Sequence, residues 1–200
     1  MTPSHCLCLT AMNADNQKLS WYPMRVTYSQ ELKVKASLDE EGIENFLPMT
    51  YQLVDVDGDR HRRLVPAIHN LIFVRSTQER ITQLKMFNKA FSSLRYMMTP
   101  LTLGSAKQEI LKVRDREMEN FLRVASVADD SVMFLDWTTV MENINRRVMV
   151  VDGPFAGVEG VIMRIRKNKH VVIKLTGVAA VAITFVPPAF LKLIEENDNK

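Results

Sequence analysis

The chain has 200 residues, 46% of them hydrophobic, and its 26 basic and 23 acidic side chains give a formal charge of +3. This length and composition allow one buried core or two small ones, and they exclude a mainly disordered chain. The charge excess is too small to demand nonspecific nucleic-acid binding. No uninterrupted apolar stretch reaches the length of a membrane span, so we expect a cytoplasmic protein without membrane contact.

Residues 1–19 are expected to form a disordered tail. They contain no basic region followed by an apolar run, so they do not resemble a secretory signal. The chain's two cysteines, Cys6 and Cys8, cannot build a tetrahedral zinc site even with His5 beside them. We therefore expect no metal and no cofactor. Met12 is an alternative start of translation.

The segment "WYPMRVTY" (21–28) is rich in aromatic and β-branched residues and predicts a strand. On this strand Tyr22, Met24 and Val26 should face the side opposite to Arg25. The next segment, 29–41, has apolar residues that alternate as in a strand, but its good helix formers favour a helix. Ser29 would cap that helix at its start, and Gly42 would follow its end.

Asp57–Gly58 lies between two β-rich runs and predicts a hairpin. The following segment, "AIHNLIFVR" (67–75), predicts a strand that is apolar on both faces. A strand of this kind is covered on both sides, either by helices of the same chain or by a partner. Further helices are predicted within 76–91 and 115–127 from apolar residues at helical spacing, which are Ile81, Leu84, Phe87 and Phe91 in the first, and Met118, Phe121, Leu122 and Ala125 in the second.

The remaining chain is predicted to contain an acidic, irregular linker at 127–144, a small β module at 145–195 and a short tail at 196–200. With a first domain at 20–126, the fold class is α+β. It consists of an N-terminal antiparallel sheet with flanking helices, followed by a small β-barrel of about fifty residues.

No arrangement of residues typical of catalysis is found, so a binding module is favoured over an enzyme. The four histidines are scattered, and the glycines of "VVDGPFAGVEGVI" (150–162) precede a strand rather than the helix of a nucleotide-binding loop. The acidic triplet Asp55, Asp57 and Asp59 lacks the glycine and glutamate positions of a calcium loop. Two basic clusters remain, at 60–63 and at 164–170.

The stretch "RVMVVDGPFAGVEGVIMRI" resembles a KOW motif, on the residues Gly153, Pro154, Phe155, Gly157 and Gly160. The stretch that follows, "VVIKLTGVAAVAITFVPPAFLKLI", is similar to the rest of the KOW domain, and the resemblance implies a five-stranded, SH3-like β-barrel. In this reading the glycines shape turns and close contacts. The barrel core is expected to contain Val148, Val150, Val161, Met163 and Ile165.

The upstream half resembles the N-terminal domain of NusG-type transcription factors, in "WYPMRVTY", "LPM" and "DVDGDRHRRLVPAIHNLIFVR". The resemblance is closest to the UpxY group of antiterminators of capsular polysaccharide operons, through "RVTYSQELKVKASLDEEGIENFLPM", "LVPAIHNLIFVRST" and "REMENFLRVA". It implies a noncatalytic bacterial factor that binds RNA polymerase and suppresses pausing and termination on specific long operons. The alternatives are a general housekeeping NusG and a ribosome-associated RNA-binding KOW protein.

The resemblance also implies sites and partners. Polymerase contacts would lie at Ile68, His69, Asn70, Leu71 and Phe73. Contacts to nontemplate DNA or leader RNA would lie at Arg25, Arg95, Arg62 and Arg63. The barrel would recruit a ribosomal protein or Rho, and the protein is expected to act as a monomer.

Overall fold

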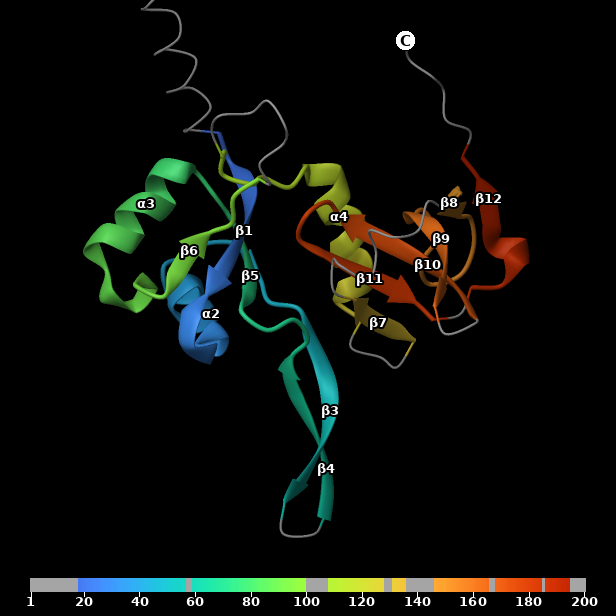
Figure 1. The fold of residues 1–200 in the computed structure, drawn as a ribbon, viewed down its shortest axis with the longest axis horizontal. Coiled ribbons are helices and arrows are strands. Elements are labelled where there is room, and N and C mark those ends of the chain that lie inside the picture. The colour runs from blue at the N-terminus through green and yellow to red at the C-terminus, as the bar shows by residue number, and fades with distance from the viewer. Residues whose placement is uncertain are drawn as a thin grey trace, which may run out of the picture. The chain divides into compact units, whose positions relative to one another are not determined.

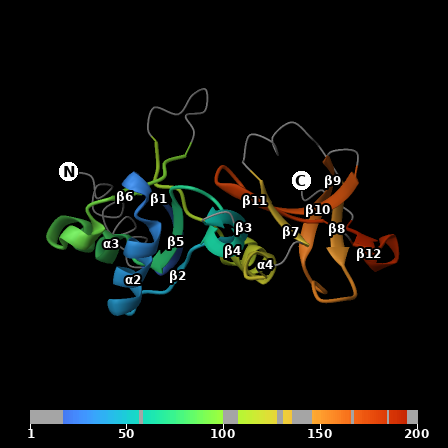
Figure 2. The ribbon, with the colours of Figure 1, turned by 90° about the horizontal axis from the view of Figure 1, so that it is seen from below.

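The computed structural model describes residues 18–56, 59–99, 108–127, 131–135, 146–165, 168–184 and 186–194. It divides into two compact units, which are described separately below: residues 1–47 with 69–115, and residues 48–68 with 116–200. Its elements are labelled in Figure 1, and Figure 2 shows them from below. Within the described residues, no helix combines the length and the apolar character that crossing a membrane requires.

The first unit contains a four-stranded antiparallel sheet in the order β2-β5-β1-β6. Its strands are β1 (Ser20–Val26), β2 (Asn45–Phe46), β5 (Leu71–Ser76) and β6 (Leu94–Tyr96). The alternation predicted for the first strand is confirmed, because Tyr22, Met24 and Val26 are fully buried whereas Arg25 is exposed. A mixed α/β chain with antiparallel sheets is therefore confirmed.

Two helices, α2 (Glu31–Glu40) and α3 (Gln78–Phe87), lie on the same side of this sheet (Figure 2). The expected Ser29 cap is wrong: α2 starts after Gln30 and its first turn has no side-chain cap. Gly42 does end the helix, with φ +66°, and the N–H groups of Gly42 and Ile43 bond to the carbonyls of Asp39 and Leu38. This pair of bonds is the Schellman arrangement that a glycine at this position favours.

Helix α3 is shorter than its apolar spacing predicts. Thr77 caps its start by accepting a hydrogen bond from the Arg80 N–H. The helix ends at Phe87, whose side chain is 82% exposed, so the prediction of Phe87 as a core residue is wrong. Phe91 is fully buried from the short 3-10 turn η2 (Lys89–Phe91), because the chain changes direction at Asn88.

The strand predicted at 67–75 begins only at Leu71. Asn70 has φ +61°, which interrupts an extended backbone, and residues 67–70 form bends and turns instead. Both faces of β5 are buried, as the two-sided apolar pattern predicts: Leu71, Ile72, Phe73 and Val74 are each at most 4% exposed.

The second unit contains the predicted hairpin, formed by β3 (Met49–Val56) and β4 (Asp59–Pro66). The strands pair as far as Val56 and Asp59, which confirms the hairpin; the predicted turn residues Asp57 and Gly58 lie outside the described residues. Helix α4 (Asp115–Ala125) buries Met118, Phe121 and Val124. Leu122, also predicted to be in the core, is only half-buried because it lies on the flank of that face.

The C-terminal part of this unit is a six-stranded antiparallel sheet in the order β12-β8-β9-β10-β11-β7. Its elements are β7 (Val132–Leu135), β8 (Arg147–Val150), β9 (Glu159–Ile165), β10 (Asn168–Leu175), β11 (Ala179–Ile183), the turn η3 (Pro188–Phe190) and β12 (Leu191–Leu193). Among the described residues the sheet is not closed into a barrel, because β12 and β7 are its unpaired edges.

Two details of this sheet differ from the sequence-based expectation. The segment assigned to a linker, 127–144, contains β7, in which "VMFL" pairs with β11 from Ala180 to Ile183. The five expected core residues lie on two faces of the sheet. Val148 pairs with Gly160 and therefore shares its face, whereas Met163 lies an odd number of residues further along β9 and faces the opposite side. Val161 and Ile165 pack with a buried cluster that contains Met163, Val172, Leu135, Ala180 and Ala182.

Several sequence expectations lie outside the described residues. They include the N-terminal tail up to residue 17 with its two cysteines, the basic residues Arg166 and Lys167, and the C-terminal tail 196–200. The domain boundaries drawn at 126 and 145 stay a prediction.

Candidate functional site

The turn before β5 is held by a side chain from α2. The Asn70 N–H donates a hydrogen bond of 2.7 Å to Oε1 of Glu31, and the Asn70 carbonyl accepts one of 3.1 Å from the Val26 N–H. Glu31 is only 3% exposed, whereas the Asn70 and His69 side chains are exposed. The turn therefore has a restrained backbone and two free polar side chains.

The five residues predicted to contact a partner divide into two classes. His69 and Asn70 are exposed and Ile68 is half-buried. Leu71 and Phe73 are 4% and 0% exposed, and the Phe73 ring lies 6.5 Å from that of Phe46, centroid to centroid. Only the first class is available on the described surface. The second class supports the strand from within the core.

The two arginines predicted to bind nucleic acid from the first unit are direct neighbours. Arg25 in β1 and Arg95 in β6 pair across the sheet, so both lie on the same face, and both are exposed. The Arg95 guanidinium donates to the carbonyl of Leu94 at 2.8 Å.

A third cation, Lys85, lies with its Nζ 4.3 Å from the centroid of the Tyr96 ring. Tyr96 follows Arg95 in β6, so this contact lies on the face opposite to the arginine pair. Partial burial lowers the pKa of Lys85, and the positive charge of Arg95 lowers it further. Burial also raises the pKa of Tyr96. Burial is the larger of the two causes, so the lowered pKa of Lys85 reflects mainly its partial removal from water.

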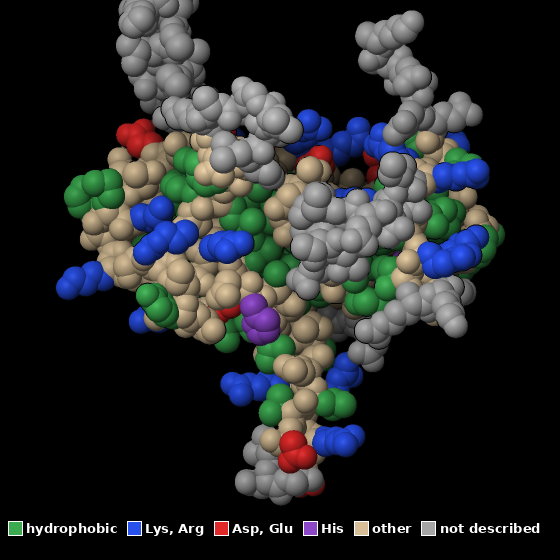
Figure 3. Space-filling model, in the orientation of Figure 1, with side chains coloured by type: hydrophobic (Ala, Val, Ile, Leu, Met, Phe, Trp, Pro, Cys, Tyr) green, Lys and Arg blue, Asp and Glu red, His purple; other side chains and the backbone are tan. Residues whose placement is uncertain are grey.

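The hairpin carries the other predicted pair, and here the structure does not bring the two arginines together. Arg62 pairs with Leu53 and Arg63 with Gln52, so their side chains lie on opposite faces of the ribbon. Arg62 lies over the ring of Tyr51 at 4.8 Å. Tyr51, Leu53 and Leu64 are exposed apolar residues on that same face. Figure 3 shows the basic and apolar side chains side by side along the hairpin.

Tyr28 is an exposed aromatic residue within the segment 21–28, for which a strand was predicted. It lies two residues beyond the end of β1, is 86% exposed and has φ +65°. Aromatic residues favour strands, and no local sequence signal separates Tyr28 from the residues of the strand before it. Its exposure becomes evident only from the turn between β1 and α2.

The glycine-rich segment of the C-terminal sheet builds a tight turn. Gly153 and Gly157 have φ +84° and +86°, and the Gly157 N–H bonds to the Val150 carbonyl at 2.7 Å. Phe155 is buried from this turn, whereas Pro154 is exposed. Gly160 is different, because a Cβ added there would lie 2.8 Å from Cγ1 of Val171 and 2.9 Å from the Val172 carbonyl oxygen. The segment thus uses glycine both for turns and for close strand packing.

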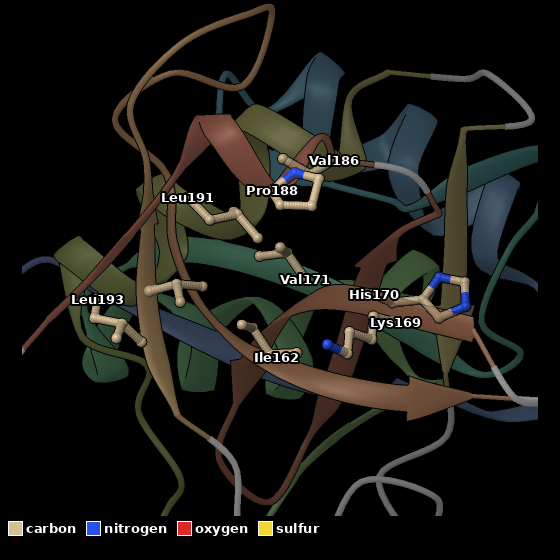
Figure 4. A pocket seen from close by; sticks show the side chains of 9 residues that line it. Ile162, Lys169, His170, Val171, Val186, Pro188, Leu191 and Leu193 are labelled. Atoms are coloured by element: carbon tan, nitrogen blue, oxygen red, sulfur yellow. The ribbon is translucent and has the colours of Figure 1, made fainter.

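The same sheet carries a mainly apolar pocket of about 220 Å³ (Figure 4). Its lining comes from four strands and the segment before β12, and consists of Val148, Ile162, Lys169, His170, Val171, Val186, Pro188, Leu191 and Leu193. The His170 ring points away from the other labelled side chains, whereas Lys169 lies among them (Figure 4). Nδ1 of His170 is buried and has no partner in the described part of the chain.

The described residues contain no group of three or more His, Cys, Asp or Glu side chains that could hold a metal ion.

Comparison with known proteins connects these features to a family. A family model described as "Transcription termination factor nusG" matches residues 19–122, which extend from β1 into α4. No curated protein sequence matches the chain significantly. The solved structure described as "Domain interaction in Thermotoga maritima NusG" is 16% identical, with 90% of this chain and 99% of that chain covered and a TM-score of 0.39.

Proposed function

The chain belongs to the NusG family of transcription factors, and on this premise we propose that it is an elongation and antitermination factor that acts by binding RNA polymerase. The family consists of non-enzymatic factors that bind RNA polymerase. The observation that carries the proposal is the family match, which covers all four strands of the first sheet and both helices beside it. We place the protein in the cytoplasm and expect it to act as a monomer.

We propose that the polymerase contact is made by Ile68, His69 and Asn70 in the turn before β5, with Leu71 and Phe73 of β5 as its buried support. The exposure of His69 and Asn70 and the restrained backbone of Asn70 support this division. A recognition loop on a rigid strand presents its side chains without a large loss of entropy on binding.

The first experiment is a pull-down of the tagged protein from its native lysate, with polymerase and ribosomal subunits both quantified. Polymerase enrichment that resists nuclease supports an elongation factor. Occupancy mapping then separates an operon-specific factor from a general housekeeping one. Ribosomal enrichment without polymerase would contradict the proposal and favour the ribosome-associated alternative.

The double substitution His69→Ala/Asn70→Gly is expected to weaken binding to purified polymerase about tenfold or more, because it removes both exposed side chains of the turn. Glycine adopts positive φ at position 70 without strain, so the fold is expected to persist. Fluorescence anisotropy with labelled protein measures the affinity. Met86→Ala, at a residue that is 70% exposed on α3, is the control and should bind as the wild type does. Unchanged affinity of the double variant would show that the contact lies elsewhere.

We further propose that Arg25 and Arg95 contact the phosphates of an exposed nontemplate DNA strand or a leader RNA, with Arg62 and Arg63 as a separate basic surface on the hairpin. The cross-strand pairing of Arg25 with Arg95 supports a joint site. Two like charges opposite one another repel unless an anion lies between them.

The double substitution Arg25→Ala/Arg95→Ala should make binding to a single-stranded oligonucleotide less salt-dependent. Each lost phosphate contact reduces the slope of log K against log salt by about 0.7 for single strands, so the pair should reduce it by about 1.4. Arg80→Ala removes one positive charge, and it should leave the slope unchanged. The Arg80 guanidinium lies 3.1 Å from the carboxylate of Glu41, the residue after α2. An unchanged slope in the double variant would exclude the proposed phosphate contacts.

We propose that the C-terminal sheet is a KOW module that recruits a ribosomal protein or Rho. The turn glycines Gly153 and Gly157, the close packing at Gly160 and the buried Phe155 support this assignment. The specialisation toward capsular polysaccharide operons, as in the UpxY group, is supported by the sequence resemblance of the N-terminal stretches. Occupancy at one operon would support it, and occupancy at most genes would contradict it.

A further inference from the structure

Glu31 is a buried carboxylate whose side chain bonds to a turn 39 residues away. It is 3% exposed, and its Oε1 accepts the Asn70 N–H at 2.7 Å. Burial of a carboxylate is unfavourable unless hydrogen bonds compensate it, and a bond from a backbone N–H to a charged oxygen is one of the stronger kinds. The hydrogen bond to the Asn70 N–H therefore offsets the free-energy cost of burying the Glu31 carboxylate.

Asn70 is held at both of its backbone polar groups. Its N–H donates to Glu31, and its carbonyl accepts the Val26 N–H at 3.1 Å. The side chains of Asn70 and of its neighbour His69 nevertheless remain exposed. A clamped backbone with free side chains is the arrangement expected of residues that are presented to a partner.

Strained backbone is concentrated around Glu31. In the described part of the chain, the non-glycine residues with positive φ are Tyr28 at +65°, Ser29 at +50° and Asn70 at +61°. The first two precede Glu31 in the sequence by three and two residues, and the third is its hydrogen-bond partner. Strain of this kind persists only where surrounding contacts impose it, and it is typical of functional sites.

We propose that Glu31 is a positioning residue: by fixing the backbone of Asn70, it sets the direction in which His69 and Asn70 are presented to RNA polymerase. The inference rests on the proposed polymerase contact at this turn. Glu31 itself does not touch the partner in this assignment, because it is buried. It acts through the hydrogen bond to the Asn70 N–H.

The test compares two substitutions of similar volume, Glu31→Gln and Glu31→Leu. Glutamine retains an oxygen that accepts the Asn70 N–H, whereas leucine fills the space without an acceptor. Two quantities are measured in the full chain: hydrogen exchange of individual amides by NMR, and affinity for purified polymerase. The amides of Met24 and Val74, within the strands of the first sheet, report on the stability of the unit as a whole.

We expect Glu31→Leu to accelerate exchange of the Asn70 amide about tenfold relative to Met24 and Val74, and to weaken polymerase binding about fivefold or more. Glu31→Gln should stay within about twofold of the wild type in both measurements, since it preserves the hydrogen bond. This rescue by the conservative variant separates positioning from a general loss of stability, which would accelerate the exchange of all three amides together.

Three results would overturn the inference. The Asn70 amide could stay protected in Glu31→Leu, or Glu31→Gln could be as impaired as Glu31→Leu. The third is unchanged polymerase affinity in Glu31→Leu although the Asn70 amide exchanges faster. In that case the polymerase affinity of His69→Ala/Asn70→Gly decides whether the role of Glu31 or the proposed polymerase contact is wrong. If the double variant binds weakly, the contact stands and only the role of Glu31 is wrong. If it binds normally, the contact itself is wrong.

Discussion

Replacing Phe73 by alanine is expected to lower the free energy of unfolding by about 3–5 kcal/mol, because the ring is fully buried and its removal leaves a cavity. Phe73 pairs with Pro23 in β1 and with Phe46 in β2, so it lies in the middle of the first sheet. A loss of this size is a large fraction of the total stability of a typical domain, which is about 5–15 kcal/mol. Urea unfolding followed by circular dichroism, together with amide exchange in β5, measures it.

The matched control is Phe87→Ala. The chemical change is identical, but the Phe87 ring is 82% exposed, so the expected change is within about 0.5 kcal/mol. Equal effects of the two substitutions would contradict the burial of Phe73.

The comparison also bears on the polymerase contact, since a Phe73 variant that fails to bind polymerase is informative only if it is folded. Variants of the exposed His69 and Asn70 avoid this difficulty.

Gly160→Ala is expected to destabilise the C-terminal sheet by about 1–3 kcal/mol, and Gly160→Val by more, because the added atoms collide with the neighbouring strand. The new Cβ would lie 2.9 Å from the Val172 carbonyl oxygen, which is backbone and cannot turn aside. The N–H groups of β9 and β10 should lose protection from hydrogen exchange, while those of β1 and β5 should not. Unchanged protection of β10 would contradict the close approach.

Gly42 provides a control with a different physical cause. It has φ +66° and no atom within 4 Å of the position of an added Cβ, so Gly42→Ala costs about 1 kcal/mol through backbone strain alone. Asparagine tolerates positive φ better than alanine, so Gly42→Asn should recover part of that loss. Gly160→Asn should be worse than Gly160→Ala, because its effect depends on volume. The opposite order at either position would contradict the assigned cause.

The features that depend on local pattern could be predicted from the sequence. The alternation in 21–26 placed Tyr22, Met24 and Val26 in the core, because side chains of a strand point to opposite faces in turn. Asp57–Gly58 predicted the hairpin, and Gly42 the end of α2, because both depend on backbone preferences of a few residues. The apolar character of both faces of β5 likewise predicted that the strand is covered on both sides.

Other features depend on contacts between distant segments, which no local pattern contains. Residues 67–70 were predicted to be part of a strand because of their apolar residues. In the structure they form a turn, since Asn70 takes positive φ where Glu31 and Val26 hold its backbone. Segment 127–144 was predicted to be a linker because it is acidic and irregular, yet its residues 132–135 pair with β11. The same holds for the candidate sites. The family resemblance implied nucleic-acid contacts at Arg25, Arg95, Arg62 and Arg63, but strand pairing places the first two side by side and the last two on opposite faces.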